Sequence, residues 1–535
     1  MSENQTWHAA SSPAPARPNL SSKHSKKTAL AVIILIIAGL IFAGVNLFAD
    51  VEESGQVVTS YFPFVLLGLA LVIALAFEFV NGFHDTANAV ATVIYTHSLP
   101  PGLAILWSGL CNFSGVLLSS GAVAFGIISL LPMELMLQAS SGNGFAMIYA
   151  LLFSAITWNL GTWYLGLPSS SSHTLIGSII GVGVANAINH GRSGVEGVNW
   201  DQAINVAYAL LFSPLIGFVS AALLLLAMKK WLRNRQLYSA PEGQQPPPGW
   251  IRALLILTCT GVSFAHGSND GQKGMGLIML ILVGAMPIAY ALNRSVPPDQ
   301  IPRVAALAQI TSQQLIGQHT LPLQGSPRDV LMQFMRSGEN TPQVAPALGA
   351  MLDKIGKQIK QYGSMENIPA QLVANTRNDM YLAAESIKQL KAAEAKFPAD
   401  TQNNLNAMKS ELDNATRFIP LWVKIVVALA LGLGTMVGWR RIVITVGERI
   451  GKTHLSYAQG ASAELVTVAT IGAADAFGLP VSTTHVLSSG VAGTMAANRS
   501  GLQMTTLRNL LIAWVLTLPV SILISALLFT LFIHL

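Results

Sequence analysis

Long apolar stretches recur along the whole chain of 535 residues, separated by shorter polar segments. Many of them reach the roughly 20 residues that an α-helix needs to cross a bilayer. The pattern therefore predicts an all-α polytopic membrane protein with about 10–12 transmembrane helices. The clearest apolar stretches are 29–48, 61–80, 104–131, 144–163, 204–228, 421–437 and 510–535.

Composition and charge agree with this prediction. Hydrophobic residues make up 52% of the chain and charged residues 10%, which is about half the charged fraction of a soluble protein. The net charge of +6 would suggest nucleic acid in a soluble protein. Here the basic residues gather at 17–27, 229–252 and 440–452, beside apolar stretches, as the positive-inside rule expects. The charge therefore indicates topology, and no nucleic-acid partner is expected.

The alternation of apolar and polar stretches also divides the chain into segments. The first apolar stretch predicts an extra helix near the N-terminus, which belongs to neither half of the chain. This helix would lead from the cytoplasm to the outside. The insert should lie on the outer, periplasmic side. We expect a disordered cytoplasmic tail at 1–27, an extra transmembrane helix at 28–60, a first transmembrane repeat at 61–228, a basic cytoplasmic linker at 229–250, the start of a second repeat at 251–292, a polar, helical, water-exposed insert at 293–417 and the remainder of the second repeat at 418–535.

A cluster of hydroxyl residues occurs twice. The sequence GLPSSSSH at 166–173 reappears in register as GLPVSTTH at 478–485. Each copy has a proline and then opens an apolar run, which places free backbone N–H groups and hydroxyls at a helix N-terminus, where an anion is favoured. We expect the two copies to lie at membrane depth, in re-entrant hairpins or helix breaks, and to form one oxyanion site. The predicted ligands of this anion are Ser170, Ser171, Ser172, Thr174, Ser482, Thr483 and Thr484.

A second pair of motifs precedes these clusters. NGFHDTANA at 81–89 lies upstream of the first cluster, and HGSNDGQKG at 266–274 lies upstream of the second. The distance from Asp85 to Pro168 is 83 positions and that from Asp270 to Pro480 is 210, and the surplus of 127 matches the polar insert. Removing the insert aligns the two halves, which predicts an internal repeat. If the linker is cytoplasmic, the two repeats are inverted.

The stretch 61–100 is too long for one ordinary span, and polar residues and glycine interrupt its centre. This pattern is typical of a helix that unwinds at the midplane, so we expect a discontinuous span or a closely packed helix pair. Alternatively, Asn81, His84 and Asn88 hold helices together by hydrogen bonds. Asp85 fits that alternative less well, because carboxylates inside a membrane are costly and usually functional.

These motifs resemble those of the inorganic phosphate transporter (PiT) family, specifically the bacterial low-affinity phosphate permeases. The resemblance runs from about Phe62 to the C-terminus, apart from the linker and insert, and includes the Gly-Trp-Arg-Arg step at 438–441. It implies phosphate uptake coupled to a cation, inverted repeats, a homodimer, and a location in the bacterial inner membrane. Bacterial relatives are similar in carrying phosphate as a neutral complex with a divalent metal such as Mg²⁺.

The family pattern Gly-Ala-Asn-Asp-x-x-Asn falls on 82–88 and 267–273, where His84 and Lys273 replace the usual Asn residues. A lysine ammonium offers only donors and a competing charge to a sodium ion, whereas an imidazole can carry a proton near physiological pH. We therefore predict coupling to H⁺, with Na⁺ as the alternative. The residues implied in cation or proton coupling are His84, Asp85, Asn88, Asn269, Asp270 and Lys273.

Two carboxylates beside phosphate oxygens make a hard-oxygen site, so Asp85 and Asp270 are candidate ligands of a co-transported divalent metal. Glu78 is a candidate proton relay, and a structural pairing with a buried donor is the alternative. No resident cofactor is expected, and the partners are inorganic phosphate and membrane lipid. A transporter of sulfate remains a rival interpretation. An intramembrane hydrolase using Ser172 and His173 is disfavoured, because a nucleophile and its base form one asymmetric site, whereas this cluster is duplicated.

Overall fold

The computed structural model describes residues 18, 20, 26–54, 62–130, 142–241, 243–317, 323–393 and 395–534, without the side chains of 86–88 and 142–143. Most of the predicted disordered tail at 1–27 therefore lies outside the described residues.

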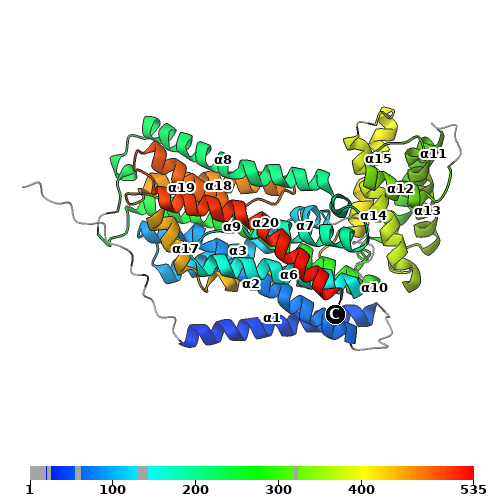
Figure 1. Ribbon diagram of the computed structural model, residues 1–535, viewed down its shortest axis with the longest axis horizontal. Coiled ribbons are helices and arrows are strands. Elements are labelled where there is room, and N and C mark those ends of the chain that lie inside the picture. The colour runs from blue at the N-terminus through cyan, green and yellow to red at the C-terminus, as the bar shows by residue number, and fades with distance from the viewer. Residues whose placement is uncertain are drawn as a thin grey trace, which may run out of the picture.

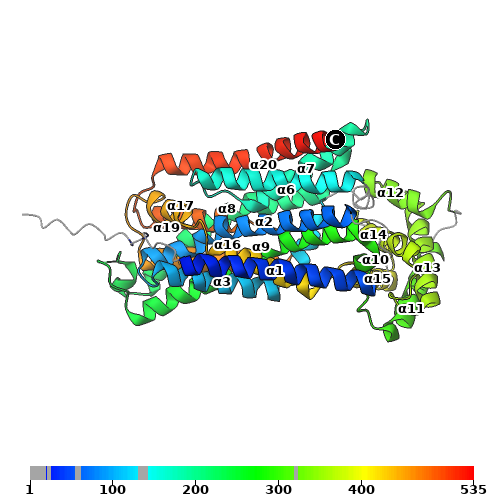
Figure 2. The same cartoon turned by 90° about the horizontal axis from the view of Figure 1, so that it is seen from below.

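The described part of the chain is helical and contains no named strand, which confirms the predicted all-α class. Figures 1 and 2 show long helices packed side by side along the long axis of the molecule. Eight of the helices described are long and apolar enough to cross a membrane, or up to nine if the bent pair α15–α16 is one span. These eight are α1 (Lys26–Glu53), α2 (Phe62–Tyr95), α3 (Pro101–Leu118), α6 (Gly142–Tyr164), α7 (Ser171–Asn189), α8 (Trp200–Trp231), α9 (Gly249–Ala285) and α20 (Met504–Phe532).

Shorter helices complete the bundle. The predicted count of about 10–12 spans included the stretch 421–437, whose helix α16 has only 15 residues. The linker between α8 and α9 is also shorter than the predicted 229–250, because α8 continues to Trp231 and α9 begins at Gly249. The shorter helices are α4 (Ala122–Ile128), α10 (Pro287–Tyr290), α16 (Leu421–Thr435), α17 (Arg440–Ile444), a π-helical turn (Thr445–Arg449), α18 (Tyr457–Ala476) and α19 (Thr483–Ala497), with 3-10 turns at Gly194–Gly197, Arg235–Tyr238 and Pro298–Gln300.

The two helices that carry the Asn-Asp motifs, α2 and α9, lie against each other and run in opposite directions. Arg252 Nε, at the start of α9, donates a hydrogen bond of 2.8 Å to the carbonyl of Ser98, just beyond the end of α2. Further along, Gly274 of α9 packs on the side chain of Glu78 of α2. The neighbouring contacts are reciprocal: α3 packs on α9 and α16 on α2, while α7 packs on α20 and α19 on α8. The inverted repeat of the whole chain stays a prediction.

The predicted break in the stretch 61–100 is wrong, because α2 is one continuous helix of 34 residues and α9 one of 37. The motif glycines allow close helix packing instead of unwinding. A Cβ atom on Gly82 would lie 2.3 Å from the carbonyl oxygen of Leu431, and one on Gly434 would lie 2.1 Å from that of Phe79. The backbones of α2 and α16 therefore touch at this crossing.

This contact predicts opposite effects for two glycines of the same helix. Gly82→Ala should lower the free energy of unfolding by about 1–3 kcal/mol, because the added methyl group overpacks a backbone contact. Gly68→Ala should raise it by roughly 0.5–1 kcal/mol, because alanine favours a helix more than glycine does. Its Cβ would meet nothing within 4 Å. Thermal unfolding of the detergent-solubilised variants measures both effects, and equal effects would contradict the packing role of Gly82.

Residues of the predicted insert fold into five helices that lie at one end of the molecule (Figures 1 and 2). They enclose an apolar core of their own, separate from the core of the membrane bundle. The insert follows the C-terminal end of α9, whereas the linker precedes the N-terminal end of that helix, so the two are joined to opposite ends of α9. The five helices are α11 (Ile301–Gly317), α12 (Pro327–Ser337), α13 (Val344–Tyr362), α14 (Ala370–Ala392) and α15 (Ala399–Thr416).

Candidate functional site

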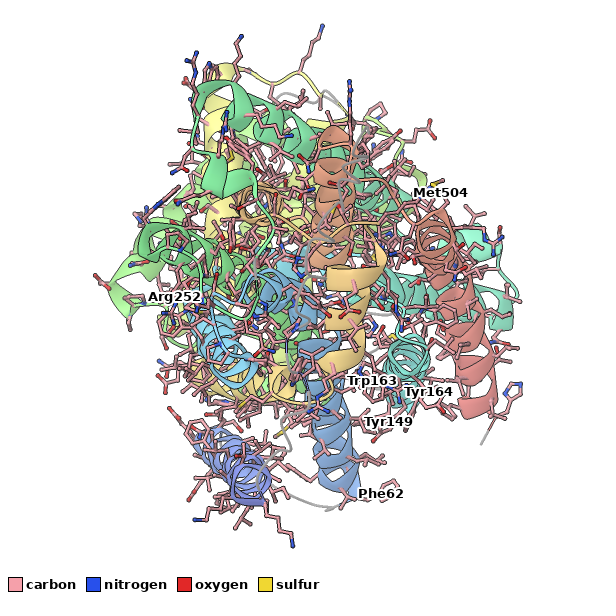
Figure 3. The ribbon with its side chains drawn as sticks, turned by 90° about the vertical axis from the view of Figure 1, so that its left-hand side faces the viewer. Phe62, Tyr149, Trp163, Tyr164, Arg252 and Met504 are labelled. Carbon is pink, nitrogen blue, oxygen red and sulfur yellow. The ribbon has the colours of Figure 1, made fainter. Side chains whose placement is uncertain are left out.

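Both hydroxyl clusters lie in helix breaks inside the bundle, as predicted. The first follows α6 and opens α7, and the second follows α18 and opens α19. Gly166 and Gly478 have φ of +68° and +65°, a left-handed conformation that glycine adopts without steric cost, and each turns the chain back towards the bundle. Figure 3 views the molecule from the end that carries the linker. Trp163 and Tyr164 are labelled there at the end of α6, just before the turn at Gly166 in the chain.

The second hydroxyl of the first cluster and its counterpart in the second cluster are helix caps. The side-chain oxygen of Ser170 accepts the backbone N–H of His173, and that of Ser482 accepts the N–H of His485, each at 3.2 Å. The clusters also touch each other, because Ser172 Oγ donates to the carbonyl of Val481 at 2.8 Å. Two capped helix N-termini are therefore joined at one place, although their sequences lie more than 300 positions apart.

Hydroxyls of both clusters meet at the buried carboxylate of Asp85. Ser171 Oγ lies 2.7 Å from Asp85 Oδ2 and 3.3 Å from Asp270 Oδ2. Thr484 Oγ1 donates to Asp85 Oδ1 at 2.5 Å. The exposed fractions of Asp85 and Asp270 are 2% and 1%. The structure thus brings together one predicted hydroxyl from each half and the carboxylates of both Asn-Asp motifs.

Asp270 is held by cationic or ionisable groups of its own helix. Lys273 Nζ lies 2.7 Å from Asp270 Oδ1, and His266 Nε2 lies 3.5 Å from Asp270 Oδ2. The lysine is completely buried, so this ion pair is shielded from water. With Asp85 and Asp270 at −1 each and Lys273 at +1, these three side chains carry a net charge of −1.

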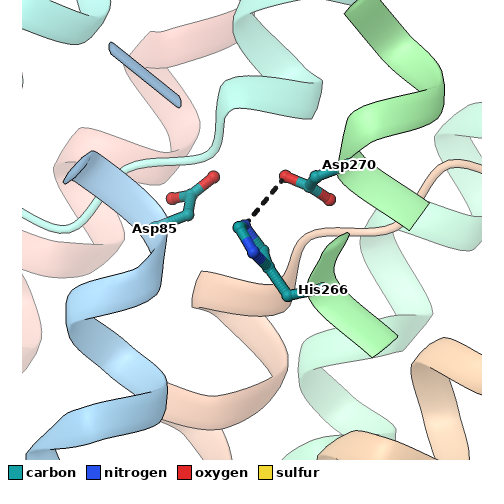
Figure 4. A group of neighbouring side chains, drawn as sticks. All are labelled: Asp85, His266 and Asp270. Atoms are coloured by element: carbon teal, nitrogen blue, oxygen red, sulfur yellow. Dashed lines mark ion pairs between the residues drawn. The ribbon is translucent and has the colours of Figure 1, made fainter. Parts of the chain in front are cut away.

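His266 is the residue that sequence reasoning missed. One ligand atom from each of Asp85, His266 and Asp270 can be chosen so that all lie within 4.8 Å of one another. Figure 4 shows the imidazole pointing into the space beside the two carboxylates. Two carboxylates and an imidazole suit a divalent transition metal, and the carboxylates alone suit Mg²⁺. The available signal was the spacing, since residues four apart on a helix share a face.

His84 connects the first carboxylate to the first hydroxyl cluster. Its Nδ1 lies 3.1 Å from Asp85 Oδ1, and its Nε2 lies 3.2 Å from Thr162 Oγ1 and 3.4 Å from Ser169 Oγ. The ring is completely buried. An imidazole in direct contact with a carboxylate can pass a proton to it, so the geometry allows the role predicted for His84.

Other predicted ligands have different partners. Asn269 Nδ2 donates to the carbonyl of Leu479 at 3.2 Å and its Oδ1 accepts the N–H of Val481 at 3.4 Å, so it braces the second hydroxyl turn. Thr174 Oγ1 donates to Asn159 Oδ1, at 2.9 Å, and therefore faces α6. Thr483 Oγ1 is buried without a hydrogen-bond partner in the described part of the chain. The side chain of Asn88 lies outside the described residues.

Glu78 lies on α2, to one side of the carboxylates of Asp85 and Asp270. It is completely buried, and neither carboxylate oxygen has a hydrogen-bond partner among the residues described. Asn81, one turn further along the same helix, interacts with Glu78, so a structural pairing with a buried donor stays an alternative to the relay. In contrast, Asp475 accepts hydrogen bonds from Ser268 and Gln272, at 2.8 and 2.6 Å. Glu78 is thus held by fewer hydrogen bonds than Asp475 in this structure.

Comparison with known proteins gives the family. A family model described as the phosphate transporter family matches residues 81–525. A solved structure described as the sodium-dependent phosphate transporter aligns with 87% of this chain and 98% of that chain, at 20% identity and a TM-score of 0.47.

Bacterial relatives match along almost their whole length. The low-affinity inorganic phosphate transporter PitA of Escherichia coli (strain K12) is 40% identical over 86% of this chain and 95% of its own, and PitB of the same organism is 39% identical over the same shares. A probable low-affinity inorganic phosphate transporter of Bacillus subtilis (strain 168) is 29% identical over 86% of this chain and 96% of its own. Together with the family match, these identities show that the chain belongs to the phosphate transporter family, whose named relatives are transporters and not enzymes.

Proposed function

We propose that this protein imports inorganic phosphate by alternating access, as a neutral complex with a divalent metal and in symport with protons. The observation that carries this proposal is the meeting of hydroxyls from both clusters with two buried carboxylates and one lysine. The family supports phosphate as the cargo, and the charges at the site support the metal complex and the proton as its companions.

Phosphate needs an accompanying cation, because the hydroxyl groups that could bind it already donate hydrogen bonds to a carboxylate. Ser171 and Thr484 donate to Asp85, so phosphate can receive these hydrogen bonds only if another positive group satisfies Asp85. A bare phosphate anion beside two carboxylates would also be repelled strongly in a medium of low dielectric constant. A divalent metal bound by Asp85, Asp270 and His266 would meet both requirements, because it can bridge carboxylate and phosphate oxygens. Here the metal is cargo and not a resident cofactor.

Proton coupling follows from the remaining charge. A neutral metal-phosphate complex leaves the net charge of −1 on Asp85, Asp270 and Lys273, and one proton cancels it. His84 touches Asp85 and is placed to deliver that proton. A sodium ion would have to compete with the ammonium group of Lys273, which already pairs with Asp270 at 2.7 Å. Glu78 remains a proposed relay on one side of the site.

Release of phosphate is easier from hydroxyls than from an arginine clamp, because charge-assisted bidentate hydrogen bonds are about twice as strong. Movement of one half of the bundle against the other would then expose the site to alternate sides. We further propose that the protein acts as a homodimer in the bacterial inner membrane, with the N-terminal tail cytoplasmic and the insert periplasmic.

Uptake of radiolabelled phosphate into proteoliposomes tests the coupling ion. We vary the pH gradient, sodium and magnesium separately, for the parent and for His84→Gln. Uptake by the parent should require the pH gradient and rise with magnesium, and His84→Gln should lose the response to the pH gradient. His454→Gln, a histidine outside the membrane-spanning helices, serves as the matched control.

Two outcomes would contradict the proposal. Uptake that follows a sodium gradient at fixed pH and ignores the proton gradient would replace proton coupling by sodium coupling. Uptake of sulfate in place of phosphate, with the same metal dependence, would show that the cargo is another tetrahedral oxyanion.

A further inference from the structure

We propose that the insert builds a second anion-binding site around Arg377, which captures phosphate from the water before it reaches the transport site. This proposal rests on the proposed function for the identity of the anion and for the location of the insert on the side from which phosphate enters. It assigns a role to the insert, in which the sequence shows no catalytic motif.

The guanidinium of Arg377 is buried without an acidic partner. The residue lies on α14 with an exposed fraction of 6%. In the described part of the chain, Asn378 Oδ1, 3.3 Å from Nη1, is its only hydrogen-bond partner, and the buried Nε has none. The guanidinium stacks 4.7 Å above the ring of Tyr381. Buried arginines are normally paired with carboxylates, so this one lacks its usual counter-ion.

A second arginine lies on the same tyrosine. The guanidinium of Arg417 is 5.6 Å from the centre of the Tyr381 ring, and it forms ion pairs with Glu385 and with Asp413, the latter at 3.1 Å. Its own charge is therefore compensated. Burial and the nearby positive charge of Arg417 both lower the pKa of Arg377, as expected for a cation without a counter-ion.

The two guanidiniums lie beside two neighbouring cavities between the insert and the membrane bundle, which share Phe125 and Arg417 in their linings. Arg377, Arg417 and Tyr381 border a small cavity of about 20 Å³, which is room for one or two water molecules. Arg417 and Phe125 also border a larger, open hollow of about 710 Å³. Lys388 lines this hollow as well. An anion in the larger hollow therefore lies against Arg417, and Arg377, which stacks on the same tyrosine ring, adds its positive charge there.

The hollow adjoins the second hydroxyl turn. Its lining includes Gly478 and Leu479, directly before the proline of the second cluster. The carbonyl of Leu479 accepts the amide of Asn269, next to Asp270 in the chain. Leu280, which lines the small cavity, follows Lys273 by seven residues on α9, or about 10 Å along the helix. The proposed site therefore lies on the insert side of the transport site, within two turns of it.

The charges favour an oxyanion. Arg377, Arg417 and Lys388 contribute +3, and Glu385 and Asp413 contribute −2, so a charge of +1 remains near the hollow. Guanidinium groups bind phosphate oxygens through two parallel hydrogen bonds, which a lysine cannot do. Basic groups lining a cleft raise the local concentration of an anionic ligand. Strong binding by guanidinium groups would hinder the release of phosphate inside the membrane. At the membrane surface the same strong binding favours its capture.

Phosphate uptake by the full chain in proteoliposomes tests the site. Arg377→Gln should raise the KM for phosphate by about tenfold, because it removes the uncompensated charge. The maximal rate should stay unchanged, since the transport site is intact. The matched control is Arg328→Gln, which removes the same charge from the same insert but leaves Asp379 paired with Lys354 at 2.8 Å. Its KM should equal that of the parent.

A KM unaffected by Arg377→Gln, or raised equally by Arg328→Gln, would overturn the proposal. If Arg377→Gln does not fold, Lys388→Gln replaces it: that variant removes one positive charge from the lining of the larger hollow, so its KM should rise, and an unchanged KM would count against the site.

Equilibrium binding of radiolabelled phosphate separates this site from the transport site. Purified Ser171→Ala protein should still bind phosphate, and adding Arg377→Gln should remove that binding. Displacement of the bound phosphate by an equal concentration of chloride would overturn phosphate capture. If the parent shows no uptake but this binding persists, the proposed transport function fails while the second site stands.

Discussion

Replacement of Asp85 by Asn is expected to reduce phosphate uptake by at least about 100-fold. The carboxylate accepts hydrogen bonds from Ser171 and Thr484, one from each half of the chain. Even changes in the groups that surround a metal's ligands typically cost about 10–100-fold in affinity or activity, and Asp85 is proposed to be a ligand itself. An amide also cannot carry the proton or bind the metal. Initial uptake rates in proteoliposomes, normalised to the amount of reconstituted protein, measure the loss.

Asp50→Asn is the matched control for this experiment. Asp50 Oδ2 accepts hydrogen bonds from Tyr290 Oη at 2.5 Å and from Trp422 Nε1 at 2.9 Å, and none of these residues belongs to either motif. An amide oxygen can still accept both bonds, so uptake should stay within about twofold of the parent. Similar losses in the two variants would show that any buried aspartate matters equally, which contradicts a specific role of Asp85.

Replacement of Lys273 by Asn should destabilise the protein and create a response to sodium. Removing one partner of a buried ion pair typically costs about 3–5 kcal/mol, because the other charge stays buried alone. In this variant Asp270 is left with His266 at 3.5 Å. A sodium ion can then occupy the space of the ammonium group, so sodium chloride should raise the midpoint of thermal unfolding of Lys273→Asn above that in choline chloride. The parent should show no such difference.

Lys424→Asn provides the control for the charge itself. Lys424 Nζ donates to the carbonyl of Ser119 at 2.9 Å, and no carboxylate depends on it among the ion pairs described. Its replacement should cost less stability and give no response to sodium. A parent protein that sodium stabilises as much as the Lys273→Asn variant would refute the idea that Lys273 excludes this ion.

Sequence reasoning predicted the helical class and the placement of the hydroxyl clusters because both depend on local chemistry. Apolar runs of sufficient length form helices in a membrane irrespective of their neighbours. Gly166 and Pro168, followed by the cap Ser170, end one helix and start another within a few residues, and the second cluster repeats this arrangement. Such signals can be read without knowing what packs against them.

Features that depend on distant residues could not be predicted in this way. Gly82 suggested an unwound helix, but the contact that explains it is the carbonyl of Leu431, almost 350 positions away. Likewise, Asn269 suggested a cation ligand, whereas its partners in the structure are backbone groups of Leu479 and Val481. An amide side chain suits either role, and only the folded chain selects between them.

The single hydroxyl proton of Ser171 has a consequence for how the duplicated chain works. The hydroxyl lies within reach of Asp85, at 2.7 Å, and of Asp270, at 3.3 Å, yet it can donate to only one of them at a time. Whichever carboxylate lacks this bond must find its positive partner elsewhere, in a metal, a proton or an ammonium group. Two matching motifs therefore meet in an asymmetric centre, because one hydroxyl proton cannot serve both carboxylates at once.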